Sequence, residues 1–276
     1  MGFLCRMKSM ILSAAVMLLT LSCASLSPNG VGRVKCYSIV SERLPESFDG
    51  YRMAFISDIH YPSLFTRSRL GRLVRKLRSE KPSILLLGGD YVTDDSYISE
   101  LFDSLSSVHV KDGIYAVLGN HESRNSSLIE NAMEESGINL LNNEVVCIES
   151  SDGAFVRLAG VGDSFGRDVF FSGCSGTLPD SVFTILLCHT PDYAERNSVD
   201  ADLVLSGHTH GGQVSLFGVF TPVKNSAYGA RFLRGSNRTT EGIEVITTNG
   251  VGTSRRKVRF CVPSEIVLVT LFRQSQ

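Results

Sequence analysis

The chain has 276 residues, of which 43% are hydrophobic, and this length is enough to bury one sizeable core without disulfides or a structural metal. Its 27 Lys and Arg residues nearly balance its 28 Asp and Glu residues, giving a formal net charge of −1. This balance argues against a protein whose whole surface attracts nucleic acid or anionic partners, so any recognition of an anion must be local.

The first 24 residues predict a signal peptide or membrane anchor. The basic residues Arg6 and Lys8 precede the apolar segment Met10–Leu21, which is too short to span a bilayer comfortably. Ser22-Cys23-Ala24 offers a small-x-small cleavage pattern, while Cys23 also ends a run that resembles a bacterial lipobox, with Thr20 as a departure. Cleavage, lipidation and an uncleaved anchor all remain open. We expect the protein in the cell envelope, associated with the membrane through its N-terminus or otherwise secreted.

Residues 25–33 follow as a tether rich in Ser, Pro and Gly, and we place a single domain at residues 34–276. Its first part alternates strands and helices, which is typical of parallel βαβ units. In chain order the predicted elements are the strand Tyr51–Ser57, helix Leu70–Ser79, strand Ile84–Leu87, helix Ile98–Ser107, strand Gly113–Leu118 and helix Ser127–Ser136.

The second part of the domain has little helical periodicity. Its strand-like segments are Leu140–Ile148, Ala154–Val161, Phe183–Cys188, Leu203–Leu205, Gly242–Thr247 and Glu265–Phe272. This pattern predicts a second, more antiparallel sheet packed on the first, and therefore an α/β fold of two sheets flanked by helices.

Five of the six histidines directly follow a predicted strand: His60, His121, His189, His208 and His210. Loops at the carboxyl ends of strands converge on one edge of an open α/β sheet, where ligands bind. The sixth, His109, has no such motif around it, and we expect it on the surface or at a helix end.

These histidines belong to five polar blocks with other ligand-type residues. The blocks are Ser57-Asp58-Ile59-His60, Gly88-Gly89-Asp90, Gly119-Asn120-His121-Glu122, His189 and Gly207-His208-Thr209-His210-Gly211-Gly212-Gln213. Taken alone, each block has an ordinary interpretation as a turn or a cap. Together they offer imidazoles, carboxylates and an amide without a thiolate, a set that suits Mn, Fe, Co or Zn, and they supply enough ligands for two cations. Asp90 is the natural carboxylate to bridge them.

In their order and spacing the five blocks resemble those of calcineurin-like metallophosphoesterases. Within that superfamily, Gly207–Gln213 and the tail from Gly250 to Ile266 are similar to a branch of bacterial membrane-associated phosphodiesterases. The resemblance implies the metallophosphatase fold, a four-layer α-β-β-α sandwich with two mixed β-sheets.

The resemblance also implies a role for each ligand-type residue. Asp58, His60 and His210 would hold one metal, and Asn120, His189 and His208 the other, with Asp90 bridging both. His121 would contact the substrate phosphate and protonate the leaving oxygen. Glu122 replaces the Asp that is common in this block, and we expect it to orient His121.

The predicted function is a two-metal phosphoesterase that hydrolyses a phosphodiester or pyrophosphate by attack of a metal-bridging hydroxide, with Mn the metal expected to support activity in vitro. An envelope or lipid-linked substrate is favoured, including a lipid A precursor of the UDP-diacylglucosamine type if the site faces the cytoplasm. Alternatives are a nucleotide or cyclic-nucleotide phosphodiesterase and a metal-binding envelope lipoprotein without turnover. The sequence does not predict the oligomeric state.

Two further segments and two single residues permit more than one interpretation. Tyr61–Phe65, which follows the first block, is either a hydrophobic lip of the site or an ordinary loop anchored by its aromatic rings. The basic run Arg255, Arg256, Lys257 and Arg259 is either a solvated face or part of the substrate mouth or a lipid contact, and Lys224 and Arg231 are similar candidates.

The cysteines outside the leader are Cys36, Cys147, Cys174, Cys188 and Cys261. They show no C-x-x-C spacing, which argues against a zinc ribbon or redox motif, although one disulfide remains open. Cys188 and Cys261 lie in apolar runs and are predicted to be buried thiols.

Overall fold

The computed structural model describes residue 13 and residues 30–162, 182–197, 199–216, 220–254 and 258–274. The predicted leader, most of the tether, Cys174 and the basic residues 255–257 lie outside these ranges. Within them, no helix combines the length and the apolar character needed to cross a bilayer.

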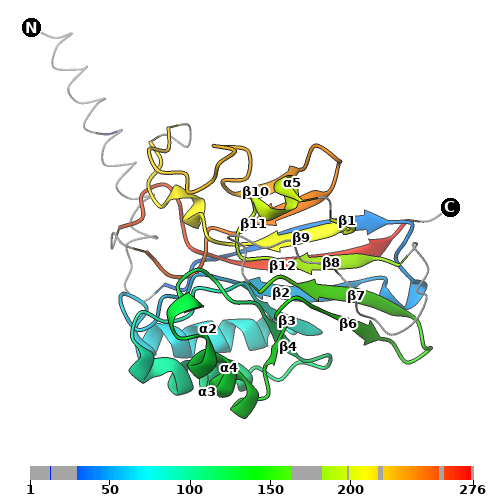
Figure 1. Ribbon diagram of the computed structural model, residues 1–276, viewed down its shortest axis with the longest axis horizontal. Helices are drawn as coiled ribbons and strands as arrows, with labels where there is room; N and C mark the ends of the chain where they lie inside the picture. The colour runs from blue at the N-terminus through cyan, green and yellow to red at the C-terminus, as the bar shows by residue number, and fades with distance from the viewer. Residues whose placement is uncertain are drawn as a thin grey trace, which may run out of the picture.

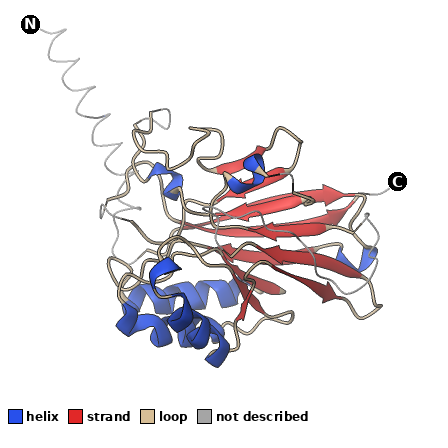
Figure 2. Cartoon of the chain, viewed as in Figure 1, coloured by secondary structure: helices blue, strands red, loops and turns tan. Residues whose placement is uncertain are grey.

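Two six-stranded sheets form the centre of the molecule (Figures 1 and 2). The first has the order β1-β12-β2-β3-β4-β5, and the second β10-β11-β9-β8-β7-β6. The bounds in the first sheet are β1 Arg33–Ser41, β2 Tyr51–Ile56, β3 Ile84–Leu87, β4 Ile114–Ala116, β5 Asn139–Leu140 and β12 Glu265–Arg273. Those in the second are β6 Glu144–Glu149, β7 Phe155–Gly160, β8 Thr184–Leu187, β9 Leu203–Ser206, β10 Gly235–Arg238 and β11 Glu244–Thr247.

Both sheets mix parallel and antiparallel pairs. In the first, β2, β3, β4 and β5 run parallel, while β12 lies antiparallel to β2. In the second, β7, β8, β9 and β11 run parallel, and the outer strands β6 and β10 are antiparallel to their neighbours. The predicted fold class of two mixed sheets flanked by helices is confirmed, with the second sheet more parallel than expected.

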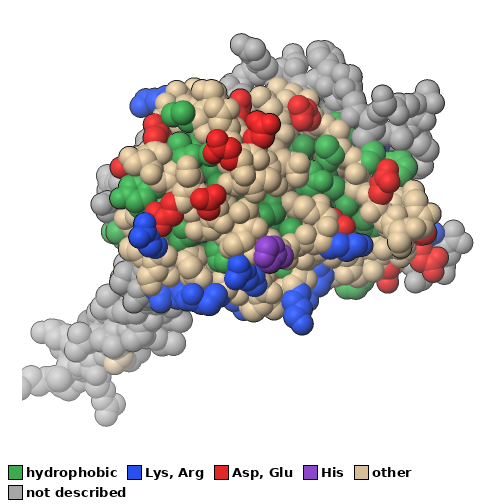
Figure 3. Space-filling view, turned by 90° about the horizontal axis from the view of Figure 1, so that it is seen from below, with side chains coloured by type: hydrophobic (Ala, Val, Ile, Leu, Met, Phe, Trp, Pro, Cys, Tyr) green, Lys and Arg blue, Asp and Glu red, His purple; other side chains and the backbone are tan. Residues whose placement is uncertain are grey.

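The helices α2 (Arg67–Glu80), α3 (Ile98–Ser106) and α4 (Ser126–Glu135) cover the outer face of the first sheet, whereas the short α5 (Tyr193–Arg196) lies over the second (Figure 1). Helix α2 begins where the Thr66 hydroxyl accepts a hydrogen bond from the Arg69 amide at 3.3 Å, and it ends at Lys81 in the left-handed conformation. The face seen from below carries charges of both signs, with Lys and Arg gathered along one side (Figure 3).

The hydrophobic core has three parts, which follow from these layers. One lies between the helices and the first sheet, and contains Leu73, Leu85 and Phe102. A second lies between the two sheets, and contains Phe55, Leu86 and Leu205. The third, with Leu186 and Phe232, covers the outer face of the second sheet. Because the central core joins the sheets face to face, it fixes the separation of the loops that leave them.

One sequence-based boundary is wrong. The segment Leu140–Ile148 was expected to be one strand, but it contains the end of β5 in the first sheet and most of β6 in the second. The chain crosses between the sheets at Leu141–Asn143, and Asn143 takes a φ of 63° there. Asn tolerates this left-handed conformation better than most residues, which explains why the turn can form at this position.

Candidate metal centre

All five predicted polar blocks lie together at the carboxyl ends of strands from both sheets. Asp58 and His60 follow β2, Asp90 follows β3 and Asn120 follows β4, whereas His189 follows β8 and His208 and His210 follow β9. Among the described residues, ten non-glycine residues have positive φ, and five of them are predicted ligands: Asp58, His60, Asp90, His208 and His210. Such strained backbone persists only where the surrounding structure holds it, and it concentrates at functional sites.

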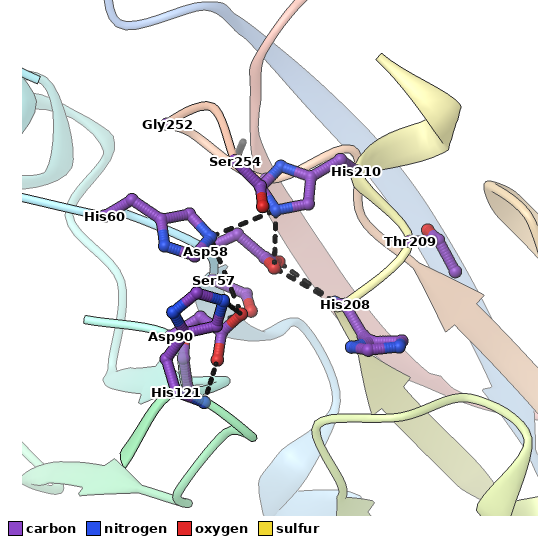
Figure 4. A network of polar contacts seen from close by, with 12 residues as sticks. Ser57, Asp58, His60, Asp90, His121, His208, Thr209, His210, Gly252 and Ser254 are labelled. Carbon is purple, nitrogen blue, oxygen red and sulfur yellow. Dashed lines mark hydrogen bonds and ion pairs between the residues drawn. The ribbon is translucent and has the colours of Figure 1, made fainter. Parts of the chain in front are cut away.

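The first group consists of Asp58, His60, Asp90 and His210, whose ligand atoms all lie within 4.8 Å of one another. The Nε2 atoms of His60 and His210 are 3.1 Å apart, and His210 Nε2 lies 3.2 Å from Asp58 Oδ1. Figure 4 shows these side chains turned toward one another. All four side chains are buried, so little water reaches their polar atoms, and a bound cation would satisfy these atoms instead.

A second group lies on the other side of Asp90. The Asn120 side-chain oxygen is 2.9 Å from His208 Nδ1 and 3.2 Å from His189 Nε2. Asp90 faces both groups, because its Oδ1 lies 3.4 Å from His189 Nε2 and its Oδ2 lies 3.5 Å from His60 Nε2. This is the placement expected of a carboxylate shared by two cations.

Protonation in the first group favours cation binding. Burial lowers the pKa of His60 to about 4, even though the Asp90 carboxylate opposes the shift. Burial, together with the charges of His60 and Arg259, places the pKa of His210 well below its usual range. Both rings are therefore neutral at pH 7, the form in which imidazole binds a metal.

In the second group, the His189 ring is oriented for binding a cation. His189 Nδ1 lies 2.6 Å from the Gly88 carbonyl oxygen, so Nδ1–H donates there and Nε2 is left to face Asn120 and Asp90. Burial alone would raise the pKa of Asp90 and lower that of His189, but their attraction holds the pKa of Asp90 well below its ordinary value and raises that of His189 to about 10. A cation bound at His189 Nε2 would take the place of the proton that this pairing favours. Two carboxylates, an amide oxygen and four imidazoles thus fit two divalent cations, whose identity the donor set leaves among Mn, Fe, Co and Zn.

His121 stands beside these groups without joining them. Its Nε2 is 3.9 Å from Asp90 Oδ2, its ring meets the His60 ring edge-on at a centroid distance of 4.8 Å, and 40% of its side chain is exposed. It also lines a polar cavity of about 560 Å³ with Asp94, Asp95, Arg124 and Asn125 among the other lining residues. An imidazole in this position can reach a molecule bound in that cavity.

Glu122 has a different place from the one predicted. Its buried carboxylate accepts hydrogen bonds from the backbone amides of Asp90 (2.9 Å), Tyr91 (2.9 Å) and Gly119 (2.7 Å). These are the hydrogen bonds of its carboxylate among the described residues, and none goes to the His121 ring. Glu122 therefore ties the second and third polar blocks together through their backbone.

Sequence reasoning placed Arg259 in a basic run at a solvated face, at the substrate mouth or at a lipid contact, and it missed the buried position of this side chain. The guanidinium is instead buried and donates to the carbonyl oxygens of Asn249 (2.5 Å), Gly252 (2.6 Å) and His210 (3.2 Å). The loop 249–252 that it holds lies against the first block, where the Gly252 amide donates to the Asp58 carbonyl oxygen at 2.8 Å. The only signal in the sequence was the alternation of this arginine with apolar Phe260 and Val262.

Other predictions met mixed outcomes. Tyr61 and Phe65 are buried in the core, so the loop 61–65 is anchored by its aromatic rings and does not form a lip. His109 is exposed beyond the end of α3, as expected. Arg231 pairs with Glu195 at 2.8 Å, away from the two groups.

The described cysteines are free thiols. Cys188 is buried as predicted, whereas Cys261 is only partly buried.

The chain is similar in sequence to known phosphoesterases. A family model for calcineurin-like phosphoesterases matches residues 51–212. A metallophosphoesterase of Aquifex aeolicus (strain VF5) is 31% identical over 249 residues, covering 87% of this chain and 91% of that protein. The phosphodiesterase YaeI of Escherichia coli (strain K12) is 32% identical over 213 residues, or 73% of this chain and 75% of YaeI. Among solved structures, a dimetal phosphatase from Danio rerio aligns over 74% of this chain and 88% of its own, with 14% identity and a TM-score of 0.42.

Proposed function

Because this chain belongs to the calcineurin-like phosphoesterase family, we propose that it hydrolyses a phosphodiester or pyrophosphate bond with the help of two divalent cations. The observation that carries the proposal is the position of Asp90, whose two carboxylate oxygens face two separate groups of ligand-type side chains. A single structural cation would need only one of those groups.

Each group would hold one cation. The first would use Asp58, His60 and His210, the second would use Asn120, His189 and His208, and Asp90 would contribute to both. When bound, two such cations activate a water molecule for attack and neutralise charge on the phosphoryl group. The chain supplies the fixed orientation, because Glu122 and Arg259 hold the loops from which the ligands project.

His121 would act on the substrate. It is the one imidazole of the site with substantial exposure, and it opens onto the polar cavity. From there its ring can donate a hydrogen bond to a phosphate oxygen and give a proton to the leaving oxygen, a role that suits imidazole near neutral pH.

For the substrate we propose an envelope or lipid-linked phosphodiester or pyrophosphate, met at a membrane with which the N-terminus associates. The apolar segment at residues 10–21 supports the location, and the similarity to YaeI, a phosphodiesterase, supports a phosphodiester. A reporter fused to the C-terminus would test the topology, since an external signal would exclude any substrate confined to the cytoplasm.

The proposal is tested with bis(p-nitrophenyl) phosphate in Mn²⁺. Asp90→Ala and His210→Ala should each abolish turnover and reduce the bound Mn²⁺ measured by elemental analysis, whereas His109→Ala, on the exposed surface, should match the wild type. Normal turnover in either ligand variant would refute the assignment. Stoichiometric metal without turnover of any phosphomonoester, phosphodiester or lipid pyrophosphate would point instead to a binding protein.

A further inference from the structure

A second cavity, of about 520 Å³, lies on the His210 side of the metal centre. Its walls come from three segments: Thr209–Val214, Pro222–Asn225, and the pair Ser254 and Val258. The apolar part of the lining is made by Val214, Pro222, Val223 and Val258. Except for the first four residues of Thr209–Val214, these walls lie beyond the part of the chain that the family model matches, residues 51–212.

The walls of this cavity are held together by backbone and amide contacts. The Ser215 amide donates to the Phe260 carbonyl oxygen at 2.9 Å, and the Phe260 amide donates to the Gln213 carbonyl oxygen at 2.8 Å. The Gln213 side chain also pairs with Ser254, accepting from its amide at 2.9 Å and donating to its carbonyl oxygen at 3.2 Å. These contacts fix the two walls to which Gln213 and Ser254 belong, so this part of the cavity is formed before a ligand arrives.

Exposed apolar side chains gather at the same place. Of the eight large hydrophobic residues exposed in the described ranges, four belong to these loops: Leu216, Phe220, Val223 and Val258, with exposures of 44%, 60%, 56% and 48%. Leu216 and Phe220 exchange two backbone hydrogen bonds, so both stand at one turn. Clustered exposed apolar residues beside a cavity mark a surface that binds an apolar group.

The two cavities differ in character on either side of the metal centre. The one at His121 is lined by Asp94, Asp95, Arg124 and Asn125, whereas the one at His210 is mainly aliphatic. A phosphoester bound between them would meet polar groups on one side and valine and proline on the other. Among the described residues, the lining of the aliphatic cavity contains no Phe, Tyr or Trp ring on which a nucleobase could stack, which favours an alkyl chain as its occupant.

We infer that this cavity binds an aliphatic chain of an amphiphilic phosphodiester or pyrophosphate while the polar part of the substrate occupies the His121 side. The inference rests on the proposed function and adds a specificity site to it. Val223 and Val258 are its principal determinants, because both line the cavity and both extend to the exposed apolar surface.

The test uses alkyl p-nitrophenyl phosphates with methyl, butyl, octyl and dodecyl chains, each below its micellar concentration, in Mn²⁺. For the wild type, kcat/KM should rise with chain length by at most about fourfold per buried methylene until the cavity is full. Val223→Ser and Val258→Ser should flatten this dependence. Val40→Ser, at a 58% exposed valine of β1, should reproduce the wild-type slope.

Two results would overturn the inference: a wild-type kcat/KM that is independent of chain length, or a slope that survives in both cavity variants. A preference for thymidine 5′-p-nitrophenyl phosphate that Val223→Ser removes would also overturn it, because the cavity would then take a base. Failure to cleave any member of the series, whatever its chain length, would refute the proposed function separately.

Discussion

The strongest structural prediction concerns Arg259→Met. In the native protein this buried guanidinium donates to carbonyl oxygens of the loop 249–252, of Val262 and of His210. The Gly250 and His210 oxygens would keep a backbone donor in the variant, from Glu265 and Gln213, but those of Asn249, Gly252 and Val262 would lose the donor that Arg259 provides.

The magnitude follows from these losses. Three carbonyl oxygens left without a donor cost about 1–2 kcal/mol each, or about 3–6 kcal/mol together. Burial lowers the pKa of Arg259 to about 10, and relief of that burial would return up to about 3 kcal/mol. The net loss therefore lies between about 0 and 6 kcal/mol, and its midpoint of about 3 kcal/mol corresponds to a fall in Tm of about 6–12 °C for a domain of this size.

The assay combines thermal unfolding without metal and Mn²⁺ titration, with Arg69→Met as the matched control. Arg69 is also buried and donates to the same loop, to the Val251 carbonyl oxygen at 2.8 Å, but it makes no contact with His210. Both variants should lose stability, whereas only Arg259→Met should weaken Mn²⁺ binding, by about 10–100-fold. Arg259→Lys, which keeps the charge with fewer donors, should fall in between. Equal loss of Mn²⁺ affinity in the two methionine variants, or an unchanged Tm for Arg259→Met, would refute this reasoning.

Three other substitutions or reactions test the loops around the metal centre. In the native protein three backbone amides donate to the Glu122 carboxylate, and Glu122→Gln would place an amide donor against them. The Tm should therefore fall by about 5–10 °C. A fall of less than about 2 °C would show that the carboxylate does not hold these loops. Gly252→Ala should impair folding or Mn²⁺ binding, because a Cβ there would lie 2.0 Å from a carbonyl oxygen of the first polar block. The control Gly71→Ala should be neutral or stabilising, because a Cβ there would have only a flexible side chain within 4 Å. Burial raises the pKa of the Cys188 thiol to about 12, so at pH 8 only about 0.01% of it is thiolate. Mass spectrometry after alkylation at pH 8 should therefore find the exposed Cys36 modified and Cys188 intact. Cys188 should react only at higher pH or after unfolding.

The buried strands were predictable because they are short apolar runs, as expected of strands that are covered on both faces. Ile84–Leu87, for example, is a short apolar run between polar residues, and it forms a strand buried along its whole length. The edge strands gave no such signal: β1 alternates between exposed and partly buried residues, and β10, with the sequence Gly-Ser-Asn-Arg, joins the sheet by pairing with β11. Tertiary pairing, and not local propensity, makes these segments strands.

The ligand residues were predictable for a related reason. Side chains such as Asp58 and His210 would bind a cation through their own atoms, so their type and their position after a strand describe their chemistry. Glu122 and Arg259 act on backbone amides and carbonyls that belong to distant segments. Nothing in the local sequence distinguishes an arginine surrounded by carbonyl oxygens from one in a solvated basic run.

The distribution of the ligands couples metal binding to the packing of the sheets. Loops of the first sheet supply Asp58, His60, Asp90 and Asn120, and loops of the second supply His189, His208 and His210. Neither proposed group is complete on one sheet, because His210 joins Asp58 and His60 in the first, and Asn120 joins His189 and His208 in the second. A cation in either group would therefore bind only when the central core holds both sheets in register, and its binding free energy would stabilise that arrangement by about 2.7 kcal/mol at a free concentration of about 100 Kd. It follows that substitutions in the core between the sheets should change metal affinity even though their side chains lie away from the ligands.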